Sequence, residues 1–413
     1  MRGFFDLKET QSVSRPDGKF YSCVSCGLYR YSINPKMPPF GNFKKGILNI
    51  GMSPTQEEDR KGKPWQGVVG RRLEREYERL GIDLFEDCLN VNAVRCRVVD
   101  KEGNDREPTS EEINSCRASI IKVIMERKPK VIMAFGNTAI NCLLGHRWKK
   151  DLGGITKWRG WVIPDRDFNA WLCPVWHPSF VVERDEREVQ IIWKQDLERA
   201  LSTHNKPFPK YEDEKSQVEI VSSSDRLIEL LREIKGLIAV DIETNSLKGY
   251  SKESKIISFA FCNSEKSAFS FLLPEDEKVL YEIKRVLRNP NIPKIAHNMK
   301  FEHTWIQNKL GYEVRNWKWD TMLASHILDN RQGITGLKFL TYVTFGIVDY
   351  DSEISSYLQP VDSKNGNSLN RIDRLLESSE GKRQLLLYNG LDTIFTYRLA
   401  IKQMKEIEYD EEN

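Results

Sequence analysis

The stretch LIAVDIETNSL, Leu237–Leu247, decides the fold of the second half of the chain. It is a short apolar run bounded by Gly236 and Asn245, and this pattern predicts a strand. Asp241 and Glu243 are two residues apart, so their side chains would project from one face. Two carboxylates on one face repel each other unless cations lie between them. Taken alone, such a stretch is more often a strand that ends in solvated acids, so the residues that follow decide between the two interpretations.

The residues after this stretch predict a mixed α/β domain. Lys255–Cys262 and Ala268–Leu273 read as strands with short, turn-rich links, which favours an antiparallel meander. A short strand is expected at Lys294–Ala296 and helices at Ser222–Ile234, Glu277–Leu287, Thr321–Leu328, Gly336–Gly346 and Gly381–Glu406. Tyr388 and Asp392 lie four residues apart in the last helix, so they share one helix face.

Four motifs follow one another over roughly residues 218–405: DIET, HNMKFE, DTMLASHILD with GLKFL, and YNGLD. In this order they resemble the DnaQ-like, or DEDD, 3′–5′ exonuclease domain of family A DNA polymerases, and YNGLD resembles the tyrosine subtype. The resemblance implies an RNase H-like mixed sheet and two Mg²⁺ or Mn²⁺ ions held about the scissile phosphate. The implied metal ligands are Asp241, Glu243, Glu302 and Asp392.

Glu302 stands where the family usually has Asp, and its one extra methylene still lets the carboxylate reach a metal. The resemblance further implies that Tyr388 orients the attacking water and that Asn298 supports the second motif by hydrogen bonding. We expect Asp320 to be only the N-cap of the following helix. We expect the tryptophans Trp305, Trp317 and Trp319 to be packing residues.

The first half of the chain alternates strands and helices. Strands are expected at Lys45–Ile50, Leu89–Val94, Lys130–Phe135 and Trp171–Val175, and helices at Arg71–Leu80, Glu111–Arg127, Asn137–Leu144 and Glu186–Leu201. Such alternation implies a mostly parallel sheet with helices on both faces. The turn-forming residues GMSPT directly follow the first of these strands, at the usual ligand-binding end of an α/β sheet.

Five motifs, GMSPT, GKPWQGVVG, VNAVRC, AFGNTAI and HPS, occur in this order over roughly residues 20–200. They resemble the uracil-DNA glycosylase superfamily, most closely its iron–sulfur branch. A glycosylase takes the base out of the stack and releases it as an anion. The resemblance implies that Trp65 stacks on the base, Asn92 reads its edge and His177 donates to its carbonyl oxygen. The other implied substrate contacts are Gly51, Met52, Ser53, Asp59 and Ser179.

Two departures from the glycosylase pattern leave two functions open. Met52 stands where the iron–sulfur branch usually has an acid that assists the attacking water, and Trp65 replaces the more usual Phe. One interpretation is a domain that excises or senses uracil-type bases. The alternative is a catalytically inactive module that binds DNA or a polymerase.

The cysteines indicate a metal or cluster site. Seven of the eight lie before residue 174, and in a reducing cytosol this favours ligation over disulfides. Cys23 and Cys26 have a two-residue spacing shared by zinc, iron–sulfur and redox sites. The glycosylase resemblance adds Cys96 and Cys116 as the remaining ligands. Four thiolates suit a 4Fe–4S cluster and also suit zinc, and Cys116 alternatively is a buried helix residue.

Length and composition fit a soluble protein of two or three domains. The chain has 413 residues, of which 39% are apolar and 30% charged, and no apolar run reaches membrane-spanning length. We expect a cytoplasmic protein with a glycosylase-like domain at 1–203, a linker at 204–217 rich in charge and holding two prolines, and an exonuclease domain at 218–413.

The two resemblances together define the expected partners. The order of domains resembles the N-terminal part of family A replicative polymerases in some large tailed bacteriophages. The expected partner is DNA, as single-stranded or frayed 3′ ends and as uracil-containing DNA, and a separately encoded DNA polymerase is a further candidate. A stand-alone protein, a proofreading subunit and a truncated form all stay open.

Overall fold

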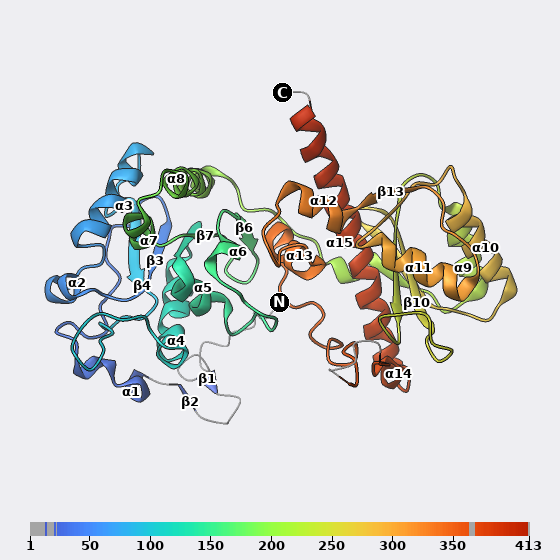
Figure 1. Ribbon diagram of the computed structural model, residues 1–413, viewed down its shortest axis with the longest axis horizontal. Helices are drawn as coiled ribbons and strands as arrows, with labels where there is room; N and C mark the ends of the chain where they lie inside the picture. The colour runs from blue at the N-terminus through green and yellow to red at the C-terminus, as the bar shows by residue number, and fades with distance from the viewer. Residues whose placement is uncertain (1–12, 15–19, 22, 363–367, 412–413) are drawn as a thin grey trace. The chain divides into compact units, whose positions relative to one another are not determined.

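The computed structural model describes residues 13–14, 20–21, 23–362 and 368–411 (Figure 1). Its contacts divide the chain into two units. The first contains Met1–Lys210 with Tyr342–Val348, and the second contains Tyr211–Thr341 with Asp349–Asn413. The division between 210 and 211 falls within the predicted linker, whereas the assignment of 342–348 to the first unit was not predicted.

The first unit is built on a five-stranded sheet in the order β4-β3-β5-β7-β6. The strands are β3 (Ile47–Gly51), β4 (Cys88–Asn92), β5 (Val131–Phe135), β6 (Ile163–Asp165) and β7 (Ala170–Val175). The first four in spatial order are parallel, and β6 pairs antiparallel with β7. The predicted parallel sheet is therefore confirmed, with one unpredicted antiparallel strand at its edge.

Helices cover both faces of this sheet (Figure 1). They are α1 (Cys23–Cys26), α2 (Gln56–Lys61), α3 (Gly67–Arg79), α4 (Ser110–Arg127), α5 (Gly136–Leu144), α6 (Ile155–Trp158), α7 (Pro178–Arg184) and α8 (Arg187–Leu201). On one face Ile47, Met133 and Val175 share a buried core with side chains of α3 and α8. Alternation along the strands turns the neighbouring residues to the other face, where α4 and α5 pack on each other and α5 lies against β3 and β5.

The short elements of the first unit are the strands β1 (Val13–Ser14) and β2 (Phe20–Tyr21) and the 3₁₀ turns η1 (Leu28–Arg30) and η2 (Ser202–Asn205). The 3₁₀ turn η3 (Glu214–Gln217) belongs to the second unit. The predicted linker, 204–217, includes the end of η2, the chain between the two turns and η3.

The second unit has a six-stranded mixed sheet in the order β13-β12-β9-β10-β11-β8. Its strands are β8 (Val218–Ile220), β9 (Ile238–Thr244), β10 (Ile256–Ser264), β11 (Ser267–Leu272), β12 (Lys294–Ala296) and β13 (Trp317–Asp320). The antiparallel pairing of β10 with both β9 and β11 confirms the predicted meander. The strands β12 and β13 extend it in parallel on one side and β8 on the other.

The helices of the second unit lie on the two faces of its sheet (Figure 1). They are α9 (Ser224–Glu233), α10 (Glu277–Arg288), α11 (Met299–Leu310), α12 (Thr321–Leu328), α14 (Ile372–Leu375) and α15 (Ser379–Glu411); α13 (Leu337–Phe345) crosses the division between the units. Val240 and Ile242 face the core formed with α9, α10 and α11, whereas Ala239 packs with Ile394 of α15. Strand alternation therefore turns Asp241 toward α15. No described helix combines the length and apolar character needed to cross a membrane.

Several side-chain predictions concern packing in this unit. Trp305 is 1% exposed in the core, and Trp317 and Trp319 pack against core clusters, so the expectation that they are packing residues is confirmed. The carboxylate of Asp320 accepts hydrogen bonds from the backbone N–H groups of Met322 and Leu323, which confirms the predicted N-cap.

Gly390 allows α15 to approach β8 closely. A Cβ atom at this position would lie 2.3 Å from Cγ1 and 3.0 Å from Cγ2 of Val218. Both atoms belong to a stiff β-branched side chain that has little freedom to move aside. The small residue in the YNGLD motif thus determines how closely the helix that carries Asp392 packs on the sheet.

We predict that Gly390→Ala lowers the free energy of unfolding by about 1–3 kcal/mol, because overpacking at Val218 outweighs the gain in helix propensity. In a Val218→Ala background the two Cγ atoms are gone and only Cβ of residue 218 remains, at 3.3 Å, so the same Gly390→Ala step should cost much less. Urea unfolding of the four proteins measures both steps. An equal loss in the two backgrounds would show that Val218 is not the cause.

Candidate functional site

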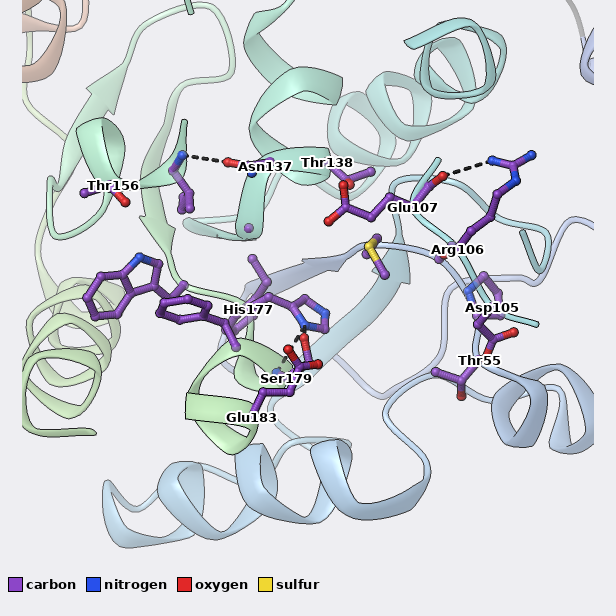
Figure 2. Close-up of a pocket in the computed structure, with 18 residues that line it drawn as sticks. Thr55, Asp105, Arg106, Glu107, Asn137, Thr138, Thr156, His177, Ser179 and Glu183 are labelled. Atoms are coloured by element: carbon purple, nitrogen blue, oxygen red, sulfur yellow. Dashed lines mark hydrogen bonds between the residues drawn. The ribbon is translucent and has the colours of Figure 1, made fainter. Parts of the chain in front are cut away.

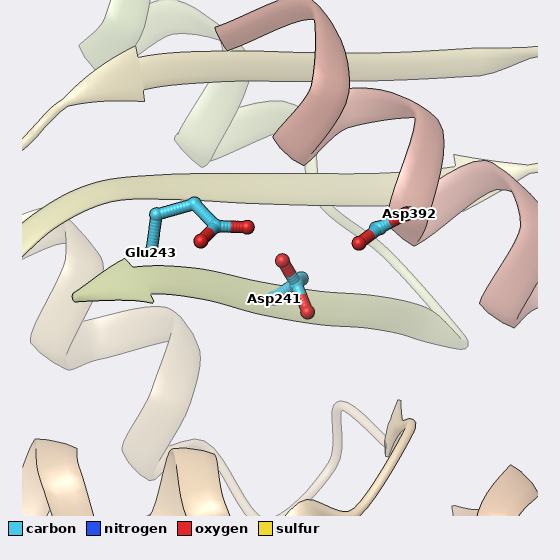
Figure 3. Close-up of side chains that lie close together, drawn as sticks. All are labelled: Asp241, Glu243 and Asp392. Atoms are coloured by element: carbon cyan, nitrogen blue, oxygen red, sulfur yellow. The ribbon is translucent and has the colours of Figure 1, made fainter. Parts of the chain in front are cut away.

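Three carboxylates of the second unit converge between β9 and α15. Asp241 and Glu243 project from β9 and Asp392 from α15, as Figure 3 shows. One oxygen from each of them lies within 4.8 Å of the others. The predicted strand face and the predicted helix face thus meet, and they place three hard oxygen donors around one point.

The negative charges of the cluster are only partly neutralised by its neighbours. Burial, followed by repulsion from Asp392, raises the pKa of Asp241 well above its usual range. Burial and then repulsion from Asp241 do the same to the pKa of Glu243. Both carboxylates would gain from a nearby cation, because a positive charge offsets the lost hydration and the mutual repulsion.

Glu302 of α11 lies beside this cluster. Its side chain is 2% exposed, and its Oε2 has no hydrogen-bond partner among the described residues. Burial raises the pKa of Glu302, and the next contribution is repulsion from Asp241. A buried carboxylate oxygen without a partner is unfavourable, and a cation would satisfy it. Glu302 is not one of the three carboxylates within 4.8 Å of one another, so it is a fourth and more distant donor.

The acids of the cluster are held by neighbouring donors. Asn389 donates from Nδ2 to Oδ2 of Asp241 at 2.6 Å, and Ser258 Oγ donates to Oδ1 of Asn389 at 2.9 Å. These contacts hold Oδ2 of Asp241 in place, and Oδ1 stays available for another ligand. Asn389 precedes Asp392 by three residues in the same helix, so one helix face carries both an acid and the group that orients another acid.

Lys338 and Tyr350 are two members of the site that the sequence analysis missed. Lys338 forms an ion pair with Asp392, and Tyr350 donates from its hydroxyl to Oδ1 of Asp392 at 2.5 Å. The ammonium of Lys338 also lies 4.0 Å from the ring centroid of Tyr388. The only available signal was the position of Lys338 in GLKFL, and no spacing rule pointed to Tyr350.

The second motif is supported through its backbone. Asn298 has a left-handed backbone (φ 71°), and its N–H donates to Oδ1 of Asp320 at 3.1 Å. Met299 N–H donates to Oδ2 of the same carboxylate at 3.0 Å. Asp320 therefore joins the start of α11 to the start of α12 and so helps to position Glu302. The role of Asn298 in substrate binding stays a prediction.

The first unit has a cavity of about 490 Å³ at the carboxyl ends of its parallel strands, and Figure 2 shows its lining. The cavity brings together four predicted residues: Met52, Ser53, His177 and Ser179. Gly51, Asp59, Trp65 and Asn92 are not among the described residues that line it. The GMSPT and HPS motifs therefore face one space, and the remaining predicted residues lie outside the lining.

His177 is a neutral hydrogen-bond donor. The backbone N–H of Ser179 donates to Nδ1 of His177 at 3.3 Å, and Ser179 Oγ lies 2.8 Å from the same atom. Because Nδ1 accepts, the proton of the neutral ring is on Nε2. Burial lowers the pKa of His177 to about 4, so the ring is uncharged at neutral pH.

Trp65 packs behind the cavity. Its ring centroid lies 5.3 Å from that of Phe135 and 5.6 Å from that of His177, two residues of the lining. Glu58 holds the turn at Trp65 (φ 59°), because its Oε1 accepts from the backbone N–H groups of Trp65 and Gln66. Sequence analysis did not identify Glu58 as the residue that positions Trp65.

Gly51 leaves room for its neighbours. A Cβ atom there would lie 2.5 Å from Oδ1 of Asn92 and 3.1 Å from Cη2 of Trp65. Two buried donors close to this point, Nδ2 of Asn92 and Nε1 of Trp65, have no hydrogen-bond partner among the described residues. Unsatisfied buried donors are rare in proteins, and each would be satisfied by a polar ligand.

Asp59 has a structural role that the sequence did not reveal. Its two carboxylate oxygens accept from the backbone N–H groups of Ile33 and Asn34, each at 2.8 Å. With 1% exposure and both oxygens engaged, this carboxylate holds the segment before β3 against α2. We therefore leave Asp59 out of the proposed site.

The four predicted cluster ligands lie near one another. Burial raises the pKa of Cys116 to about 12, and repulsion from Cys26 and Cys96 adds to this effect. Repulsion between Cys23 and Cys26 also contributes to the raised pKa of Cys26, after burial. No three of their sulfur atoms come within 4.8 Å of one another in the described part of the chain. The thiols thus gather in one region but more widely than the carboxylates of the second unit.

We predict that the imidazole of His177 titrates near pH 4 and carries its proton on Nε2 at pH 7. Because the unfolded chain takes up this proton near pH 6.5 and the folded protein excludes it, His177 makes the folded state less stable as pH falls from about 6.5 to about 4. Nitrogen-15 NMR of labelled histidine, with His177→Gln to assign the signal, measures midpoint and tautomer. A midpoint near 6.5 would contradict the burial of this ring.

Comparison with known proteins agrees with the two units. Residues 218–408 match a family model described as 3′–5′ exonuclease, and residues 38–197 match the uracil DNA glycosylase superfamily. The type-4 uracil-DNA glycosylase of Thermotoga maritima is 32% identical over 180 residues, which are 44% of this chain and 88% of the relative. The corresponding enzyme of Pyrobaculum aerophilum is 32% identical over 168 residues, 40% of this chain and 81% of the relative.

A DNA polymerase of Bacillus phage SP01 is 24% identical over 416 residues, which are 92% of this chain and 42% of the polymerase. Among solved structures, Brucella melitensis NrnC with bound Mg²⁺ has a TM-score of 0.33 and 17% identity, covering 47% of this chain and 81% of NrnC. Escherichia coli RNase D has a TM-score of 0.34 and 16% identity, covering 46% of this chain and 45% of RNase D. The chain belongs to the uracil-DNA glycosylase superfamily through its first unit, and its second unit is a DnaQ-like 3′–5′ exonuclease domain of the polymerase A type.

Proposed function

We propose that the second unit, with the predicted domain bounds 218–413, removes nucleotides from the 3′ ends of DNA by metal-dependent hydrolysis. The observation that carries this proposal is the convergence of Asp241, Glu243 and Asp392 within 4.8 Å, with Asp392 buried and the other two acids partly buried. Acids this close together are unfavourable unless a cation is held between them. Their position on a strand and a crossing helix matches the motif order of the exonuclease family.

The donor set fits Mg²⁺ or Mn²⁺. All three close donors are carboxylate oxygens, and Glu302 adds an oxygen that no described group satisfies. When bound, two such cations stabilise the attacking and leaving oxygens of an in-line displacement at phosphorus.

The residues of this chain then have separate tasks. Asn389 fixes one oxygen of Asp241, and Tyr350 fixes one oxygen of Asp392, so each acid keeps a second oxygen for a metal. Burial, followed by repulsion from Asp392, raises the pKa of Tyr388 well above its usual range. Tyr388 therefore keeps its hydroxyl proton at neutral pH, and we assign it the orientation of the attacking water.

We propose single-stranded or frayed 3′ ends of DNA as the substrate and a DNA polymerase as the functional partner. The similarity to a phage protein described as a DNA polymerase over most of this chain supports both. Such a nuclease would remove mismatched 3′ nucleotides during DNA replication.

We predict that 5′-labelled single-stranded DNA is shortened from its 3′ end in the presence of Mg²⁺. Asp241→Ala should reduce the rate at least about a thousandfold, since metal-held charge stabilisation contributes several kcal/mol and each tenfold requires 1.36 kcal/mol. Asp225→Ala, which removes an exposed carboxylate from α9, is the matched control and should behave like the wild type. Equal rates for the wild type and Asp241→Ala would refute the assignment.

The cavity of the first unit favours a second candidate function, the excision of uracil-type bases from DNA. Its observation is the neutral Nε2–H of His177 at the cavity, with the unpartnered Nδ2 of Asn92 and Nε1 of Trp65 behind the lining. Negative charge develops on the departing base, and a fixed neutral donor such as His177 stabilises it. In this proposal Trp65 provides the aromatic face, and Ser53 and Ser179 provide polar contacts at the cavity.

We infer that Cys23, Cys26, Cys96 and Cys116 hold a 4Fe–4S cluster in this unit. Around a tetrahedral zinc with Zn–S bonds of about 2.3 Å, thiolate sulfurs lie about 3.8 Å apart. No three of the four sulfurs lie mutually within 4.8 Å, which fits the wider spacing of a 4Fe–4S cluster, and the type-4 uracil-DNA glycosylases that resemble this unit also support the cluster. Such a cluster would join α1 and α4 to the segment after β4.

We predict that uracil-containing duplex DNA acquires alkali-sensitive abasic sites on incubation with the protein. His177→Ala should reduce the rate at least about a hundredfold, the usual effect of losing one fixed donor to a developing charge. His326→Ala, which alters an exposed histidine of α12, is the control. The protein is purified under anaerobic conditions and its iron content is measured. An inactive sample that has merely lost its cluster can then be recognised.

Intact uracil DNA after incubation with the iron-loaded wild type would decide for the alternative. In that case the first unit is a DNA- or polymerase-binding module, because Met52 supplies no acid to assist water. Gel-shift measurements on the same DNA would then show binding without excision.

A further inference from the structure

Lys338 contributes a fixed positive charge to the acid cluster. Its ammonium forms an ion pair with Oδ1 of Asp392, and the two side chains are only 15% and 8% exposed. The pairing involves one of the three acids that lie within 4.8 Å of one another. A charge that is already in place before any metal arrives must influence how metals bind there.

The ammonium is held by more than the ion pair. It donates to the hydroxyl of Tyr350 at 2.8 Å, and that hydroxyl donates to Asp392. It also lies 4.0 Å from the ring centroids of both Tyr350 and Tyr388, a favourable position for a cation over an aromatic face. Lysine side chains lose much rotamer freedom when fixed, so these contacts indicate a built position rather than a chance surface pairing.

The ammonium of Lys338 has opposite effects on the two kinds of charge near it, the carboxylates and a bound cation. The carboxylates of Asp241 and Glu243 gain from Lys338, which lowers the pKa of both. A divalent cation bound at Asp392 would instead be repelled by the ammonium across a short distance in a weakly screened interior. Lys338 therefore favours the acid cluster without metal and disfavours the cluster with metal.

We propose that Lys338 is a resident counter-ion of the exonuclease site, which holds Asp392 in place when cations are absent and competes with cation binding at Asp392. This inference rests on the proposed exonuclease function and deepens it, because it assigns a regulation to the same carboxylates. Lys338 is a positioning residue that acts through Asp392. The consequence is a site that fills with divalent cations less tightly than its four acids alone would allow.

A counter-ion and a merely structural lysine differ in what their removal does to two quantities, the stability of the metal-free protein and the affinity for cations. Removing the ammonium should destabilise the metal-free protein, because the buried acids then repel one another without a counter-charge. The same change should strengthen cation binding. A lysine that only packs in the fold would weaken both.

The test is a titration of the metal-free full chain with Mn²⁺. The electron paramagnetic resonance signal of free Mn²⁺ measures how much of the ion stays unbound. Lys338→Met, which keeps most of the side-chain volume, should bind Mn²⁺ at least tenfold more tightly than the wild type. Lys338→Arg keeps the charge and should stay within threefold of the wild type. Lys278→Met removes an exposed charge from α10 and should change nothing.

Thermal unfolding of the same proteins measures the second effect. In a chelator the midpoint of Lys338→Met should lie below that of the wild type, and saturating Mn²⁺ should close or reverse the gap. Where Lys338→Met does not fold without metal, Lys338→Gln takes its place. That variant removes the charge but keeps a polar group near Asp392, and it should bind Mn²⁺ at least threefold more tightly.

Equal or weaker Mn²⁺ binding by Lys338→Met, or by Lys338→Gln where it is used, would overturn the counter-ion proposal. Asp241→Ala distinguishes this outcome from failure of the exonuclease assignment. If the wild type binds Mn²⁺ and Asp241→Ala does not, the carboxylate site stands and only the role of Lys338 is wrong. If the wild type itself does not bind Mn²⁺, the proposed metal-dependent function fails.

Discussion

The second unit depends on a repulsion that its own fold creates. The strand β9 and the helix α15 bring Asp241, Glu243 and Asp392 together in a partly buried place, where lost hydration and mutual repulsion raise the pKa of Asp241 and Glu243. Like charges in such a place are unfavourable, and the surrounding groups are arranged to reduce this disadvantage. Asn389 and Tyr350 donate to the acids, Gly390 brings α15 close to the sheet, and Lys338 supplies a positive charge.

The first unit uses the opposite electrostatic arrangement. Its cavity contains a neutral histidine whose proton position is set by the backbone of Ser179, and two buried donors nearby have no partner among the described residues. Uncharged donors suit a ligand whose negative charge develops only during reaction, whereas clustered acids suit a ligand that is positively charged from the start. Under the two proposed functions, the units recognise DNA through different chemistry, one at a base and the other at a phosphate.

Local patterns predicted most of the fold and part of the site. The two-residue alternation around Asp241 and the four-residue spacing from Tyr388 to Asp392 follow from backbone geometry, and both were visible in the sequence. The short strands β6, β8 and β13 were missed, although the equally short β12 was predicted, because three or four residues carry little periodicity and depend on their partners to form strands. Lys338, Tyr350 and Glu58 were missed for a related reason. Their roles arise from tertiary contacts with residues 54, 42 and 7 positions away.

The central claim is that the acids of β9 and α15 form a divalent-cation site. Crystals of the protein soaked in MnCl₂ test it directly through the anomalous scattering of manganese. Our account predicts a strong peak within bonding distance of Asp241 and Asp392, with Glu243 or Glu302 completing the ligands. Manganese peaks elsewhere on the protein, with none between Asp241 and Asp392, would contradict it.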